Sequence, residues 1–297
     1  MNRSWMFVLA ASLLAAPASS QTLDASAELM RTLTEAPGPS AFEESVREIV
    51  VREFEDLGAD IRFDGLGSVL ATVPGGAGGP VVMVTAHLDE VGLMVQYITP
   101  DGFIRVKALG GWLRQALPDQ RWTILGSDGP VMGISGIRTV HVTPAAQRER
   151  VWALEEIFLD VGATSRDEVE AMGVRPGDGI APLSDFAVLA NERYAAKAWD
   201  DRVGLAVMLV AARRIRDEGI QVPAEVDWVA TTQEEIGLRG AQTAVALAQP
   251  EIGISIEAGV AADFPGIGPT QAQERLGGGP GMFLLDSSMI PNKKFRD

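Results

Sequence analysis

Three short, largely apolar runs of the sequence each lie just before a histidine or an acidic residue. They are residues 81–84 before His87, 226–230 before Glu234, and 252–256 before Glu257. Runs of this kind are typical of strands buried on both faces, as in a parallel sheet covered by helices. Ligands of open α/β sheets collect outside the carboxyl ends of the strands. The runs therefore predict an α/β domain with a site at one edge of its sheet.

Two helices are expected beside this sheet. Ser40 and Glu43 match a capping box, with serine as the N-cap and glutamate three residues on, and apolar residues follow at helical spacing to residue 57. A second amphipathic helix is expected over residues 203–215, directly after Asp200.

The middle of the chain has a different texture, with short strand-like runs such as 93–98, 103–107 and 121–125 separated by turn signals. We interpret it as a small β-rich domain inserted into the α/β domain. The predicted organisation is a signal peptide over 1–20, a first part of the catalytic domain over 21–90, the insert over 91–191, and a second part over 192–297.

The first 20 residues have the pattern of a secretory signal peptide. Arg3 precedes an apolar stretch, and small residues at 18–20 precede Gln21. The stretch is too short for a membrane anchor, although an uncleaved N-terminal anchor is the alternative. We expect an exported protein, periplasmic or extracellular, with no membrane association after the signal is removed.

The sequence has no cysteine, so disulfides cannot stabilise an exported chain and a large core must do so. Its formal net charge is −15, and removal of residues 1–20, whose only charged side chain is Arg3, changes it to −16. A chain this acidic has no electrostatic complementarity to phosphate backbones, which excludes nucleic acid as the expected partner.

Five candidate positions fall where strands end or helices begin: His87, Asp200, Glu234, Glu235 and Glu257. Imidazole and carboxylates suit zinc or its first-row neighbours. Each residue alone has an ordinary reading, as a core histidine, a helix N-cap at Asp200 or Asp201, a solvated loop, or a strand-end acid. Their shared placement favours a metal site, in which Asp89 would accept the second ring N–H of His87.

The adjacent pair Glu234 and Glu235 points in opposite directions on an extended segment. One carboxylate can hold metal while the other serves as general base, as metal-assisted hydrolysis requires. A glycosidase needs carboxylates facing each other roughly 5–9 Å apart, which this pair suits badly. His141, which has no acidic neighbour, is interpreted as structural or interfacial.

From residue 33 to the end, the sequence resembles the tetrahedral aminopeptidases, the glutamyl and deblocking aminopeptidase family of dinuclear metallopeptidases, some of which are called endoglucanases. The motifs include "APGPSAFEESVR", "TAHLDEVGLMV", "FLDVGATSRDEVEAMGV", "KAWDDRVG", "TTQEEIGLRGA" and "IEAGVAADFPG", in this order. The fold implied is α/β, with a mixed central sheet flanked by helices and an inserted small β-barrel-like domain. Family members process peptides from the N-terminus and assemble from dimers into dodecamers, with the insert serving dimerisation.

The resemblance also implies two divalent metal ions, Zn²⁺ or Co²⁺, and a role for each site residue. His87 and Glu257 would bind the first metal and Glu235 the second, with Asp200 bridging them. Glu234 would be the general base, and Asp89 would orient His87.

In the family, a late histidine binds the second metal, and this sequence has no histidine after His141. The second site would then keep Asp200 and Glu235 and be incomplete. A truncated or frameshifted gene model, a naturally shortened protein, and completion by another subunit are the three explanations.

The leading hypothesis is an exported metal-dependent aminopeptidase that uses metal-activated water. The alternatives are a catalytically impaired or truncated relic that retains metal or peptide binding, a related amidohydrolase or carboxypeptidase, and an endoglucanase.

Overall fold

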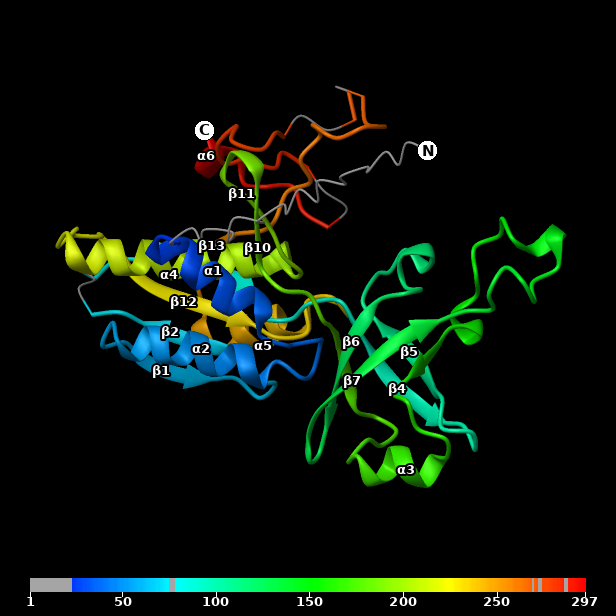
Figure 1. Ribbon diagram of the computed structural model, residues 1–297. Coiled ribbons are helices and arrows are strands. Elements are labelled where there is room, and N and C mark those ends of the chain that lie inside the picture. The colour runs from blue at the N-terminus through cyan, green and yellow to red at the C-terminus, as the bar shows by residue number, and fades with distance from the viewer. Residues whose placement is uncertain (1–22, 75–77, 269, 272–273, 286–287) are drawn as a thin grey trace, which may run out of the picture.

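The computed structural model describes residues 23–297 except 75–77, 269, 272–273 and 286–287 (Figure 1). The signal peptide expected over residues 1–20 lies outside the described residues. Among the helices that are described, none is both long and apolar enough to cross a bilayer.

A mixed five-stranded sheet forms the centre of the first unit, in the order β1-β2-β12-β3-β13. β3 runs parallel to both β12 and β13, whereas β2 is antiparallel to β12 and β1 to β2. The bounds are β1 (Asp60–Phe63), β2 (Val69–Thr72), β3 (Val81–His87), β12 (Glu225–Thr231) and β13 (Ile252–Ser255). The predicted mixed sheet is confirmed.

Helices cover the two faces of this sheet unequally. α1 (Ala25–Glu35), α2 (Glu44–Glu55) and α4 (Trp199–Asp217) pack on one face, where Leu33, Val50 and Leu209 are fully buried against the strands. α5 (Arg239–Ala248) lies on the other face, where Ala244 contacts a smaller cluster. Both clusters bury apolar surface without any disulfide, as a chain lacking cysteine requires.

Two local predictions are wrong. β13 was expected to be buried on both faces, but it is an edge strand with Gly253, Ile254 and Ser255 exposed, because β3 is its only strand neighbour in the described sheet. The capping box is also wrong. Glu43 occupies the N-cap of α2 without a side-chain cap, and the Ser40 hydroxyl donates to the Asp89 carboxylate instead.

Between β3 and α4 the chain forms the second unit, a closed six-stranded barrel beside the sheet (Figure 1). Its strands are β4 (Gly92–Ile98), β5 (Ile104–Leu109), β6 (Arg121–Gly126), β7 (Gly129–Gly136), β8 (Phe158–Asp160) and β9 (Gly179–Pro182). The barrel has its own buried core, which includes Leu93, Ile124 and Leu159. The inserted β-barrel predicted from the sequence is therefore confirmed.

The remaining elements are short, and all but the last of them fall between β5 and α4 in the chain. They are η1 (Arg114–Ala116), η2 (Ala145–Gln147), η3 (Leu154–Glu156), α3 (Arg166–Ala171), β10 (Ala187–Leu189), η4 (Ala190–Glu192), β11 (Arg193–Ala195) and α6 (Lys293–Arg296). β10 and β11 form a separate hairpin that leads the chain back from the barrel to α4.

Candidate metal centre

The imidazole of His87 lies at the carboxyl end of β3, and only 2% of this residue is exposed. Its Nδ1 is 2.9 Å from the main-chain carbonyl oxygen of Asp89. A carbonyl only accepts hydrogen bonds, so Nδ1 carries a hydrogen and Nε2 is the ring nitrogen that remains to bind a metal. The Asp89 carboxylate, expected to accept this N–H, lies slightly farther away, with Oδ1 3.5 Å from Nδ1.

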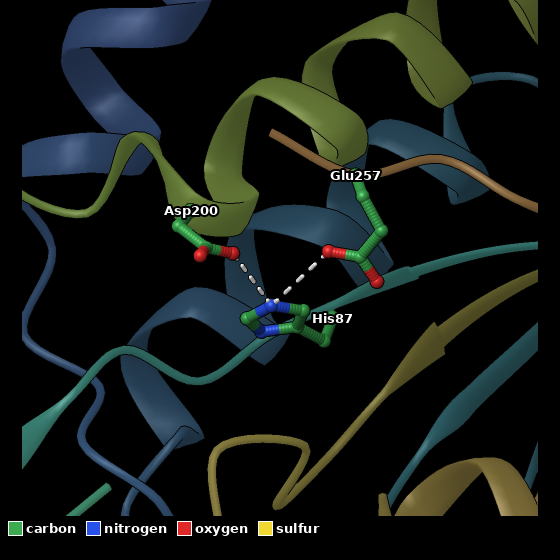
Figure 2. Close-up of side chains that lie close together, drawn as sticks. All are labelled: His87, Asp200 and Glu257. Carbon is green, nitrogen blue, oxygen red and sulfur yellow. Dashed lines mark hydrogen bonds and ion pairs between the residues drawn. The ribbon is translucent and has the colours of Figure 1, made fainter. Parts of the chain in front are cut away.

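Carboxylates from three other segments surround the Nε2 atom of His87. The Asp200 Oδ1 atom is 2.9 Å away and the Glu257 Oε2 atom 3.7 Å away, and Figure 2 shows both side chains pointing at the imidazole. The Oε2 atom of Glu234 is 3.9 Å from the same nitrogen. These segments are far apart in the sequence and converge at one edge of the sheet.

Asp200, the predicted metal ligand, and Asp201, considered only as a helix N-cap, have different roles at the start of α4. Both depart from helical φ/ψ values, and the peptide bond between them is cis. Asp200 is largely exposed and faces His87. Asp201 is fully buried, and its carboxylate accepts the backbone N–H groups of Gly204 and His87. Asp201 therefore caps the helix and ties it to β3.

The arrangement of His87, Asp200 and Glu257 fits a divalent cation. The three ligand atoms, one from each residue, all lie within 4.8 Å of one another. Among the described residues, no other group of three or more histidine, cysteine or acidic side chains has this spacing. In the unliganded protein a proton on Nε2 satisfies this arrangement, and a divalent cation can replace that proton among the same nitrogen and carboxylate donors. One nitrogen and two carboxylate donors match the ligand chemistry of zinc or its first-row neighbours.

The electrostatics of the unliganded site point the same way. Burial alone would lower the pKa of His87, but the hydrogen bonds to Asp200 and Asp89 and the charge of Asp201 raise it well above its ordinary value. Burial, aided by neighbouring carboxylates and opposed by His87, raises the pKa of Glu235 to about 7 and that of Asp201 to about 8. Burial likewise raises the pKa of Glu234 and of Glu257. A bound cation reduces the electrostatic repulsion among clustered carboxylates of this kind.

Glu235 lies outside the group formed by His87, Asp200 and Glu257. Glu235 lies beside the barrel instead. Gly110 of the barrel approaches it so closely that a Cβ atom added to Gly110 would be 3.2 Å from the Glu235 Cβ atom. Gly110 has a φ of +83° and follows β5, so the close approach and the backbone conformation both favour glycine there. The insert thus reaches the edge of the site.

Asp89 holds the Glu234–Glu235 segment as well as the imidazole. Its Oδ1 accepts the backbone N–H of Glu234 at 2.8 Å, and its Oδ2 accepts that of Glu235 at 3.1 Å. The Ser40 hydroxyl donates to the same Oδ2 at 2.6 Å. Although burial opposes it, these bonds and His87 lower the pKa of Asp89, so the carboxylate stays charged.

A buried ion-pair network missed by sequence reasoning supports the segment that carries Asp200. The Glu90 carboxylate accepts from Lys197 Nζ at 2.5 Å and from the Gly38 backbone N–H at 3.1 Å. Arg202 is fully buried and donates to the main-chain oxygens of Leu33 and Ala36. The network joins the end of α1, the loop after β3 and the start of α4. Its charged residues are distant from one another in the sequence, so no local sequence pattern predicts that they pair.

His141 lies in the connection between β7 and β8, is exposed, and takes no part in the group around His87. Its interpretation as structural or interfacial stays a prediction.

Comparison with known proteins places these residues in context. A family model described as M42 glutamyl aminopeptidase matches residues 67–297. A lysyl aminopeptidase of Pyrococcus furiosus is 38% identical over 234 residues, which cover 77% of this chain and 65% of the relative.

Solved structures match as well. A TET aminopeptidase from a marine sediment Thaumarchaeota archaeon aligns with a TM-score of 0.88 and 41% identity, covering 91% of this chain and 76% of that one. The TET1 peptidase of Pyrococcus horikoshii aligns with a TM-score of 0.71 and 28% identity, covering 78% and 68% of the two chains.

The two histidines of the chain offer a matched pair for testing the metal centre. His87→Ala removes the nitrogen ligand and should weaken Zn²⁺ binding by about 100-fold or more, since even residues behind the ligands contribute about 10–100-fold. His141→Ala should leave affinity unchanged. Calorimetric titration of the metal-free protein with Zn²⁺ measures both, and equal affinities of the two variants would contradict the assignment.

Proposed function

The chain belongs to the M42 glutamyl aminopeptidase family, whose members are dinuclear metallopeptidases, and from this premise we propose that it removes N-terminal residues from peptides at the centre formed by His87, Asp200 and Glu257. The observation that carries the proposal is the convergence of one imidazole and two carboxylates beside a further half-buried acid, Glu234. That combination supplies metal ligands and a proton acceptor in one place.

The residues of this chain divide the work of hydrolysis. A divalent ion, when bound, supplies Lewis acidity that polarises the scissile carbonyl and makes water a better nucleophile at neutral pH. Glu234, whose side chain is 26% exposed, is free to accept the proton of the attacking water and to pass it to the leaving amine. Asp89 keeps the Glu234 backbone and the His87 ring in register while the proton moves.

The proposal extends to the substrate and to the second metal. The matching family model is that of an aminopeptidase, which favours release of N-terminal residues over the carboxypeptidase alternative. Glu235 and Asp200 are the residues proposed for the second metal, and zinc or cobalt is the proposed metal. Metal content per chain, measured beside turnover of an aminoacyl anilide, separates an active dinuclear enzyme from a metal-binding relic.

We also propose that the protein is a homo-oligomer in which the barrel forms a dimer contact. The TET1 peptidase of Pyrococcus horikoshii can assemble into a tetrahedron or a large octahedral shell. In this chain the connection between β7 and β8 extends away from the barrel (Figure 1), with Val140 52% and Val142 67% exposed. Exposed apolar side chains on a protruding segment suit an interface.

Glu234→Gln keeps the shape of the proposed base but removes its ability to accept a proton. Turnover of an aminoacyl anilide should fall by about 10²–10⁴-fold, with metal content unchanged. Glu251→Gln, an exposed change just before β13, should match the parent protein. Full activity in Glu234→Gln would overturn the mechanism. Release of reducing sugar from cellulose that chelators do not abolish would instead support the endoglucanase alternative.

Assembly is tested by native mass spectrometry of the purified protein. We expect even multiples of the chain mass up to a dodecamer, and a smaller species for Val142→Glu, which places a charge in the proposed contact. Val207→Glu, on an exposed face of α4, serves as the control. A monomer at every concentration would contradict the proposal.

Export is proposed on the pattern of residues 1–20 alone. When the gene is expressed in a bacterial host, the intact mass of protein from outside the cytoplasm should correspond to a chain that starts at Gln21. Recovery of the chain from the cytoplasm with Arg3 retained would count against export.

A further inference from the structure

The loop after β12 is held by side chains from elsewhere in the fold. Four successive backbone N–H groups each donate to a side-chain acceptor of another segment. Thr232 donates to Ser68 at 3.3 Å, Gln233 to Glu43 at 3.0 Å, Glu234 to Asp89 at 2.8 Å, and Glu235 to Asp89 at 3.1 Å. The position of Glu234 therefore depends on three residues outside its own loop.

Glu43 is the most distant of these acceptors, 190 residues before Gln233, and it is only 1% exposed. Its Oε1 accepts the N–H groups of Gln233 and Ala41 at 3.0 and 2.9 Å. Its Oε2 lies 3.6 Å from an Arg47 guanidinium nitrogen, and Arg47 Nε donates to the Gly67 carbonyl at 2.7 Å. Both carboxylate oxygens of Glu43 are thus held by contacts, and the side chain points from the N-terminus of α2 toward the loop after β12.

Gln233 needs such a partner because its backbone has a φ of +54°, in the left-handed region. A residue with a Cβ pays free energy to adopt this conformation, so it persists only where the surroundings hold it. Gln233 immediately precedes Glu234, and a change in its φ would redirect the Glu234 side chain.

We propose that Glu43 is a positioning residue for the proposed general base: by accepting the Gln233 N–H, it holds the 232–235 loop so that Glu234 faces the metal centre. The inference rests on the proposed function, in which Glu234 accepts the proton of water. Glu43 touches neither metal nor substrate and acts through the backbone of its neighbour in space.

Two conservative substitutions separate the hydrogen bond from the charge. Glu43→Gln removes the charge but keeps a carbonyl oxygen at the reach of Oε1. Glu43→Asp keeps the charge, but its side chain is one methylene shorter, so its carboxylate no longer reaches the Gln233 N–H. A misplacement of about 1 Å in a catalytic group can cost about 10²-fold in rate, so reach should matter more than charge.

We expect Glu43→Asp to lower kcat by about tenfold or more with KM and metal content unchanged, and Glu43→Gln to stay within about threefold of the parent. The same two changes at Glu44 give matched controls. Glu44 is 67% exposed and pairs with the same Arg47 at 3.7 Å, so neither control should alter kcat. Equal losses in both Glu43 variants, full activity in both, or a loss in Glu43→Gln alone would overturn the proposal.

Amide hydrogen exchange provides a readout that does not depend on activity. In the parent protein the Gln233, Glu234 and Glu235 amides should exchange at least about tenfold more slowly than amides of solvent-exposed loops. In Glu43→Asp this protection should fall at residues 232–235 while α4 stays protected. Free exchange of the Gln233 amide in the parent protein would overturn the inference even if the aminopeptidase assay succeeds. Retained protection with no peptidase activity would count against the proposed function alone.

Discussion

Parallel pairing of β3 with β12 and β13 is the constraint on which the site depends. The register sets His87 opposite Thr231 in one neighbour and Thr85 opposite Ser255 in the other. All three strands therefore end at the same edge of the sheet. Glu234 and Glu257 follow within a few residues of their strand ends, so their carboxylates reach the His87 imidazole without any long excursion of the chain.

Around this edge, buried polar side chains hold the segments that carry the functional groups. Asp89 and Glu43 accept hydrogen bonds from backbone N–H groups of the 232–235 loop. Asp201 accepts the backbone N–H of His87 and caps α4. Glu90 and Lys197 form a buried pair beneath the same helix. Removal of one partner from a buried ion pair destabilises a protein strongly. Loss of Glu90 or Lys197 should therefore lower the stability of the fold as well as disturb the site. The barrel adds a boundary at Gly110, beside Glu235.

The sequence predicted the parts of this arrangement that depend on local pattern. Apolar runs that end at His87, Glu234 and Glu257 located the strand ends, and turn signals located the insert. Ser40 and Glu43 were misread because their spacing fits a helix cap, while their actual partners lie 49 and 190 residues away. Asp200 and Asp201 have the same side chain, so local pattern does not distinguish them. The resemblance named Asp200 as the ligand, and the folded backbone shows that Asp200 faces the imidazole while Asp201 binds backbone N–H groups. Long-range hydrogen bonds leave no periodic trace, which is why these roles required the structure.

The central claim is that His87, Asp200 and Glu257 together hold a divalent metal beside Glu234. Anomalous diffraction at the zinc edge from crystals of the Zn²⁺-loaded protein tests it directly. The account predicts a peak about 2.0–2.2 Å from the His87 Nε2 atom and from an oxygen of each of the two carboxylates. A zinc peak bound elsewhere, with His87 engaged only by its neighbouring carboxylates, would contradict it.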